Sequence, residues 1–135
     1  MSSSITFFNH DAGKKMAETF NYSQVAKLAN GAVALSGMLG VDATVTLAPT
    51  LEQQVETILD HIEAALAAAS AKPTDVFKVI SYHIDIEESA GLITAGWLRR
   101  YNFKPTWTAI GVAQLAIPGA RLEVQVEAWR CSQDN

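Results

Sequence analysis

The stretch Pro118-Gly-Ala-Arg-Leu-Glu-Val-Gln-Val-Glu-Ala128 alternates polar and apolar side chains, residue by residue, after its Pro-Gly start. Successive side chains of a β-strand point to opposite faces, so the alternation predicts a strand with one polar and one apolar face. The polar face would carry Arg121, Glu123, Gln125 and Glu127. The apolar face would carry Leu122, Val124, Val126 and Ala128. Four polar groups in a row need water or a partner, so this face is the first place to look for a site or an interface.

The elements before this strand predict an α+β fold. A second strand-like run, Pro105-Thr-Trp-Thr-Ala-Ile-Gly-Val-Ala-Gln-Leu115, is joined to the last strand by the short Pro-Gly turn. The clearest helix starts at Thr50, where Thr50-Leu-Glu-Gln53 has the capping-box pattern, and Lys72-Pro73 stops it. Its apolar face would carry Val55, Ile58, Leu59, Ile62, Leu66 and Ala69. A strand at residues 76–84 and a weaker helix at residues 87–101, loosened by Gly91 and Gly96, follow.

The first third of the chain reads as mostly extended. Residues 24–28 and 32–37 predict a hairpin around Asn30-Gly31, a strong two-residue turn signal. Residues 1–20 read as irregular apart from a strand at residues 5–8, and residues 41–47 as a short strand or an extended loop. The alternation in residues 76–84 would set Val76 and Tyr82 opposite Phe77 and His83. We therefore expect one domain, residues 1–135, with two helices packed on one face of a mixed sheet.

Composition limits the classes of function. Charged residues make up 18% of the 135 residues and the net charge is −4. Nucleic-acid binding normally leaves a basic footprint, and no Lys/Arg cluster exceeds Arg99-Arg100, so nucleic acid is not an expected partner. A small, half-apolar protein with little charge often buries extra surface in an oligomer.

Cysteine use and hydropathy predict a cytoplasmic protein. The single Cys131 cannot form an intramolecular disulfide and fits a reducing compartment, and we expect it to be a bystander. The first residues lack a basic n-region and a signal-peptide core, and no apolar run approaches the ~20 residues that span a bilayer. His10, His61 and His83 show no metal-ligand spacing, so we expect neither metal nor cofactor.

Several short motifs resemble the RidA/YjgF (reactive intermediate deaminase) family. Asn21-Tyr-Ser-Gln24 is similar to its Pro-Tyr-Ser-Gln, Leu35-Ser-Gly-Met38 to its Val-Ser-Gly-Gln, and the last strand to its Val-Glu-Ile-Glu strand, all in the family's order. The resemblance implies a chorismate-mutase-like fold, usually a homotrimer with clefts between subunits. It also implies enzymes that hydrolyse reactive enamines or imines derived from amino acids.

The resemblance assigns roles to particular residues. Glu123 falls at the water-positioning glutamate, with Gln125 as the alternative occupant; the competing interpretation is the solvated face of an edge strand. Tyr22 falls at the cleft tyrosine, or is a core aromatic residue beside the hairpin. Ser36 and Gly37 match the segment whose backbone lies along the ligand, or form a turn at a strand end.

Trp107 marks a departure from the family, because it aligns with the arginine that grips the substrate carboxylate. An arginine fork makes two charge-assisted hydrogen bonds, whereas indole offers one neutral donor and a flat apolar face. Ala109 falls at a position that is often cysteine and, by parity, shares a face with Trp107. Arg121 is a candidate substitute cation, although a neighbouring carboxylate is its expected partner.

Three functions stay open at this point. The first is a small-molecule enzyme with Glu123 moving a proton or positioning water, in hydrolysis or a repurposed dehydration or isomerisation. The second is a non-catalytic binding or interaction protein that keeps the trimer. The third is a ribonuclease, against which the acidic charge argues.

Overall fold

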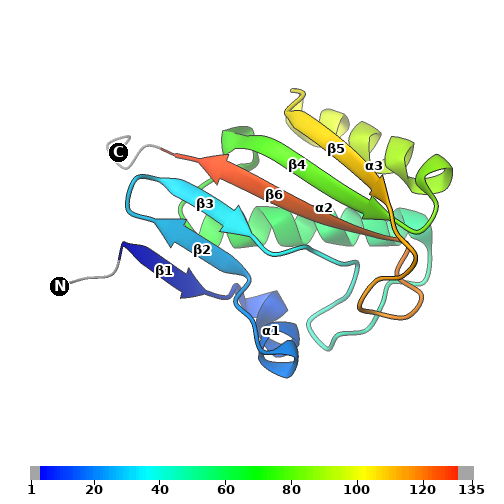
Figure 1. The fold of residues 1–135 in the computed structure, drawn as a ribbon, viewed down its shortest axis with the longest axis horizontal. Helices are drawn as coiled ribbons and strands as arrows, with labels where there is room; N and C mark the ends of the chain where they lie inside the picture. The colour runs from blue at the N-terminus through cyan, green and yellow to red at the C-terminus, as the bar shows by residue number, and fades with distance from the viewer. Residues whose placement is uncertain (1–3, 131–135) are drawn as a thin grey trace.

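The computed structural model describes residues 4–130, which fold into one twisted sheet with the long helices on one side of it (Figure 1). The six strands lie in the order β1-β2-β3-β6-β4-β5. β4 and β5 run parallel, and the other neighbouring pairs run antiparallel. The strands are β1 (Ile5–Phe8), β2 (Val25–Leu28), β3 (Ala32–Leu35), β4 (Val76–His83), β5 (Thr106–Gly111) and β6 (Leu122–Trp129). The described helices are α1 (Lys14–Phe20), α2 (Leu51–Ala68) and α3 (Ile86–Tyr101), with 3-10 turns at Asp11–Gly13 and Pro73–Asp75.

Helix α2 begins as the sequence predicts. The Thr50 hydroxyl accepts a hydrogen bond from the Gln53 backbone N–H at 3.1 Å, and the Gln53 side-chain oxygen Oε1 accepts one from the Thr50 N–H at 3.2 Å. All six residues of the predicted apolar face are buried, and the helix packs on β3 and β6. It ends at Ala68, before the predicted Lys72-Pro73 stop, because Ser70 adopts a left-handed conformation (φ 62°) that turns the chain.

Strand β6 alternates as predicted, with its four apolar side chains buried on the helix side. It lies between β3 and β4, so the edge-strand interpretation is wrong. The last two strands also do not pair with each other, because β4 lies between them. β4, α3 and β5 form a strand–helix–strand unit, and such a unit sets its two strands side by side in parallel.

The N-terminal hairpin is confirmed, and one helix was missed. β2 and β3 pair antiparallel through Val25 and Leu35, with Gly31 at φ +100° in the turn. Residues 14–20, predicted to be irregular, form α1, whose only buried residues are Met16 and Ala17. An apolar signal of one turn is too short to reveal a helix. Residues 41–47, predicted to be a short strand or an extended loop, form a tight turn, in which the Val45 N–H bonds to the Asp42 carbonyl and one isolated bridge joins Val41 to Leu47.

The predicted alternation fails at the start of β4. A β-bulge between Val76 and Lys78 buries Val76 and leaves Phe77 49% exposed, because the bulge reverses the facing of the residues before it. From Val79 onward the pattern holds. Gly96 does not loosen α3 as predicted. A Cβ there would lie 3.2 Å from Leu59 of α2, so the glycine allows the two helices to approach closely.

Within residues 4–130, no helix combines the length and the apolar character needed to span a bilayer.

Candidate functional site

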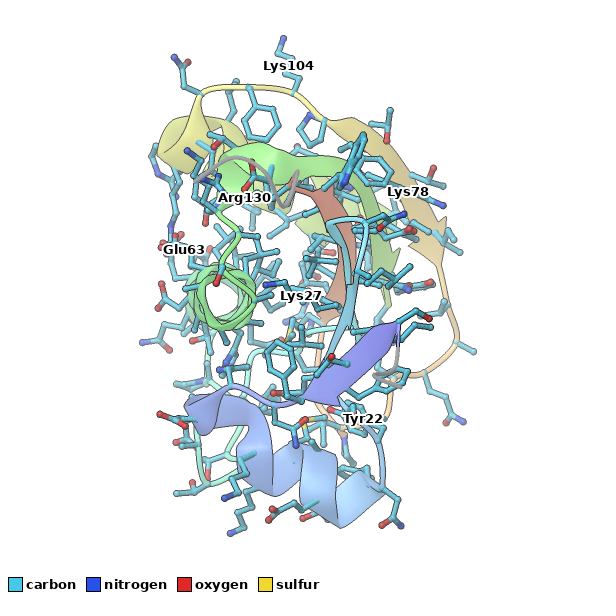
Figure 2. All side chains as sticks on the ribbon, turned by 90° about the vertical axis from the view of Figure 1, so that its left-hand side faces the viewer. Tyr22, Lys27, Glu63, Lys78, Lys104 and Arg130 are labelled. Atoms are coloured by element: carbon cyan, nitrogen blue, oxygen red, sulfur yellow. The ribbon has the colours of Figure 1, made fainter. Side chains whose placement is uncertain are left out.

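The face of the sheet that α2 and α3 leave uncovered carries the polar side chains of β6. Two of them have partners on β4. Gln125 accepts a hydrogen bond from the Tyr82 hydroxyl at 2.9 Å, and Glu127 lies 3.5 Å from Lys78 Nζ. Figure 2 shows Lys78 on the side of the sheet away from α2. Glu123 differs from both, because its carboxylate has no hydrogen-bond or ion-pair partner among residues 4–130.

Glu123 is a half-buried carboxylate near the start of β6, beside the segment that follows β3. Burial raises its pKa above the ordinary value, because water no longer solvates the charged form fully. The chain after β3 continues alongside β6 through a bridge between Met38 and Val124, which lays Gly37 against Glu123. A Cβ at position 37 would collide with the Glu123 carboxylate, so the absence of a side chain there makes room for the acid.

Tyr22 reaches the same region from the end of α1. Asn21 closes that helix in a left-handed conformation (φ 60°), and Tyr22 follows it, as Figure 2 shows. Burial raises the Tyr22 pKa, a hydrogen bond from Gln24 lowers it, and the nearby Glu123 charge raises it. The phenol is therefore neutral and can donate a proton in a hydrogen bond.

Ser36 lies in the segment between β3 and Gly37. Its N–H bonds to the Gln24 carbonyl at 2.9 Å, and its hydroxyl donates to the Ser23 carbonyl at 2.8 Å. These bonds tie the Ser36–Gly37 backbone to the chain beside Tyr22. The structure thus brings together Tyr22, Ser36, Gly37, Glu123 and Gln125 on or beside the open face.

Trp107 and Ala109 lie on the other face of the sheet. Trp107 pairs with Val79 and Ala109 with Ser81, so both share the side of the sheet that faces the helices. Their shared face was predicted from parity. Within one chain, however, Trp107 and Glu123 point away from each other, and no single protomer joins them in one cleft.

Comparison with known proteins agrees with this architecture. The profile of the family described as endoribonuclease L-PSP matches residues 13–129. The RutC family protein YjgH of Escherichia coli (strain K12) is 34% identical over 96 residues, which are 70% of this chain and 72% of YjgH. The chain belongs to the RidA/YjgF family.

Solved structures of this family share the fold. A structure of protein YjgH has a TM-score of 0.87 and 28% identity, covering 97% of this chain and 100% of its own. Rv2704 of Mycobacterium tuberculosis, of the YjgF/YER057c/UK114 family, has a TM-score of 0.79 and 22% identity, covering 94% and 100%. E. coli TdcF with bound serine has a TM-score of 0.73 and 23% identity, covering 81% and 87%. The predicted α+β, chorismate-mutase-like fold is confirmed, and RidA/YjgF membership supports a small-molecule-related function.

In this RidA/YjgF member, a buried chain of hydrogen bonds fixes Trp107. Its indole N–H donates to Ser81 Oγ at 2.8 Å, and Ser81 Oγ lies 2.6 Å from His83 Nε2. His83 Nδ1 lies 2.6 Å from Ser89 Oγ, which donates to the Asp85 carbonyl at 3.1 Å. Since Ser89 gives its proton to Asp85, it accepts one from Nδ1, and Nε2 of the neutral ring accepts from Ser81. Burial lowers the His83 pKa and keeps the ring neutral.

Arg121 is not a free substitute for the arginine of the family. Its guanidinium pairs with Glu88 at the start of α3, so the partner is a carboxylate, as expected, but one that is distant in the sequence. The Arg121 guanidinium is therefore already bound to the Glu88 carboxylate, which offsets its charge.

His10 and His61 lie side by side, and His83 belongs to the chain of hydrogen bonds that holds Trp107. Among residues 4–130, no three His, Cys, Asp or Glu side chains gather as metal ligands. His61 bonds to the Val41 carbonyl, and its ring centroid lies 5.2 Å from that of His10. His10 is buried, and neither ring nitrogen has a partner in the described part of the chain. Cys131 lies outside the described residues.

Sequence reasoning missed two supporting groups. Tyr82 stands directly opposite Glu123 on β4 and holds Gln125, and Ser81 holds Trp107. For Ser81 the alternation of residues 79–83 carried the signal, because it puts a serine and a histidine on the apolar face, where buried polar side chains require partners. The partner strands were not predictable from that pattern alone.

Proposed function

We propose that this protein is a RidA-type enzyme that acts on a small organic metabolite, with Glu123 moving a proton or activating water. The observation that carries the proposal is the unpaired, half-buried Glu123 carboxylate against Gly37 and near Tyr22. Leaving a carboxylate without a partner in a half-buried position is destabilising, and such groups gather at functional sites. Gln125 is already engaged by Tyr82, which favours Glu123 over Gln125 as the acting residue.

The reaction that fits best is hydrolysis of an enamine or imine. Glu123 takes a proton from water as the water oxygen bonds to the imine carbon. The imine enters in its protonated form, so this addition gives a neutral carbinolamine. Its nitrogen receives that proton back from Glu123, and the C–N bond breaks as the hydroxyl gives its own proton to Glu123, so ammonia and a carbonyl compound leave. The neutral Tyr22 phenol donates a hydrogen bond to a polar atom of the ligand, and the Ser36–Gly37 backbone lies along it. A repurposed dehydration or isomerisation would use the same proton transfer.

We place the reaction in a cleft between subunits of a homotrimer. Glu123 and Trp107 occupy opposite faces of one chain, so only different copies can bring them together. Several large apolar side chains of the strands are exposed: Phe7, Phe77, Ile110 and Trp129. Exposed apolar side chains on uncovered strands favour association of copies. A soluble trimer of single-domain chains in the cytoplasm is the corresponding cellular form.

The test replaces Glu123 by glutamine, which keeps shape and hydrogen bonding but removes basicity. Imines generated in situ by an amino-acid oxidase serve as substrates, and release of ammonia is measured. We expect Glu123→Gln to lower turnover about 10²–10⁴-fold while circular dichroism and gel filtration stay unchanged. Gln125→Ala is the matched control on the same face. Full activity in Glu123→Gln together with its loss in Gln125→Ala would assign the role to Gln125.

A second candidate, a non-catalytic small-molecule-binding protein, is favoured by Trp107. Its indole takes the place of the family's arginine and is committed to Ser81, so the usual carboxylate grip is absent. If no imine is turned over by the wild-type protein although ligands bind, this candidate replaces the enzyme. The family description also names an endoribonuclease activity. The net charge of −4 argues against that activity for this chain, because RNA binding normally needs a basic surface.

A further inference from the structure

A cavity of about 340 Å³ opens between the C-terminal half of α3 and the start of β5. Its volume lies within the ~300–1,000 Å³ of small-molecule pockets. Three aromatic side chains line it: Trp97, Phe103 and Trp107. Leu98, Pro105 and Ala95 add aliphatic surface, so the walls are almost entirely carbon.

The aromatic walls are held in fixed orientations. Trp97 meets Trp107 edge-on, with ring centroids 5.9 Å apart and planes at 86°, and meets Phe103 at 6.0 Å and 65°. Trp97 is 1% exposed, and the Ser81 hydroxyl fixes the Trp107 ring through its indole N–H. That bond satisfies the one polar atom of the Trp107 side chain, so Trp107 presents only carbon to the cavity.

Polar groups at the cavity are few. The Thr94 hydroxyl lines the cavity and donates to the Ala90 carbonyl at 3.0 Å. The indole N–H of Trp97 has no acceptor among residues 4–130, but it is buried and adds no polar group to the cavity surface. Lys104 also contributes to the lining, and Figure 2 shows its side chain extending into solvent. A charge so well hydrated adds little to binding.

From these features we infer that the cavity binds planar aromatic molecules, and that the ring rather than the charge decides affinity. Aromatic rings of a ligand pack edge-to-face against the fixed rings of the wall. The inference rests on the proposed function and deepens it. Trp107 is a wall of the proposed cleft, so the substrate is expected to carry an aromatic side chain.

The experiment measures binding of small probes to the full chain by isothermal titration calorimetry. Benzoate and its neutral counterpart benzamide are planar, cyclohexanecarboxylate has the charge without the planar ring, and acetate has only the charge. We expect benzoate and benzamide to bind within about threefold of each other. Cyclohexanecarboxylate should bind about threefold to tenfold more weakly, and acetate not measurably. Equal binding of acetate and benzoate, or absence of saturable aromatic binding, overturns the inference.

Two phenylalanine substitutions locate the site. Ala95 lines the cavity and is exposed on α3, so Ala95→Phe fills the space, whereas Ala64→Phe adds the same ring at an exposed position of α2 away from it. We expect Ala95→Phe to weaken benzoate binding about tenfold or more and Ala64→Phe to leave it unchanged. If both variants bind like wild type, the ligand lies elsewhere and the inference is wrong. If wild type binds nothing and Ala95→Phe dissociates the oligomer, the cavity is filled by another copy instead.

Glu123→Gln separates this inference from the proposed function. Benzoate binding should persist in Glu123→Gln, because the residue lies outside the cavity lining. If no probe binds but Glu123→Gln abolishes turnover, the inference of an aromatic ligand is wrong and the proposed enzymatic role of Glu123 is retained. If the probes bind and Glu123→Gln keeps full turnover, the inference of an aromatic-binding cavity is retained and the proposed catalytic role of Glu123 is wrong.

Discussion

Gly37→Ala is the sharpest perturbation of the candidate site, because it moves the Glu123 carboxylate while residue 123 remains a glutamate. The new Cβ would collide with the Glu123 carboxylate, which is the far end of a flexible side chain and not fixed backbone. Gly37 does not adopt a positive φ, so alanine brings no backbone strain. The carboxylate therefore swings away while the sheet stays intact.

The magnitudes predict opposite behaviour of stability and rate. Alanine in place of an unstrained glycine stabilises by about 0.4–1 kcal/mol through the unfolded chain. Forcing Glu123 toward a less favourable rotamer costs about 0.5–1.5 kcal/mol. The two terms nearly cancel, so the free energy of unfolding should change by less than about 1 kcal/mol. Loss of a positioned base should lower turnover about 10²–10⁴-fold.

Urea unfolding and ammonia release from imines test the two halves separately. Gly91→Ala is the matched control, because a Cβ there meets nothing within 4 Å. It should stabilise helix α3 by roughly 0.5–1 kcal/mol and leave turnover unchanged. Full turnover in Gly37→Ala would refute the role of the Glu123 position. A loss of stability above about 3 kcal/mol would mean that the sheet itself had been disrupted.

Two further outcomes follow from pKa and from Trp107. Burial lowers the pKa of His10 and of His83 below the ordinary 6.5, so below that pH the unfolded chain binds protons that the folded chain refuses. The free energy of unfolding should therefore be highest above about pH 6.5 and decrease as the pH drops below that value. The decrease should be smaller in His10→Gln, and equal urea midpoints at pH 7.5 and 5.5 would contradict this expectation. Because Trp107 cannot grip a carboxylate in two places, kcat/KM for small aliphatic 2-imino acids should be about tenfold to a hundredfold below that of an arginine-bearing relative in the same coupled assay. Equal values would remove the argument from Trp107.

The sequence was most informative where structure is set by local periodicity. The facing of every residue of β6 and the capped start of α2 follow from neighbours a few positions away. The order of the strands does not, because the pairing of β6 with β4 depends on contacts across some forty residues. The bulge after Val76 likewise comes from pairing with β6, and no pattern within β4 reveals it.

The same limit explains what could be predicted of the site. Tyr22, Gly37 and Glu123 were chosen as separate motifs, and only the course of the chain after β3 brings them together. Parity correctly set Trp107 and Ala109 on one face of their strand. Parity did not predict on which face of the sheet Trp107 and Ala109 lie. It relates residues of one strand only, and the register of pairing is needed to relate two strands.

The opposite facing of Glu123 and Trp107 makes the proposed trimer testable through activity. Light scattering should give a trimer at micromolar concentration, and a monomer would end the proposal. Glu123→Gln and Trp107→Ala should each be nearly inactive alone, and full activity of Trp107→Ala would remove Trp107 from the ligand wall. In a head-to-tail ring, each site takes Glu123 from one copy and Trp107 from the next. Refolding equal amounts of the two variants together should then restore about a quarter of wild-type activity, since half of the copies on each side of a site carry the intact residue. If both residues served one site within a single chain, every chain in the mixture would remain defective and no activity would return.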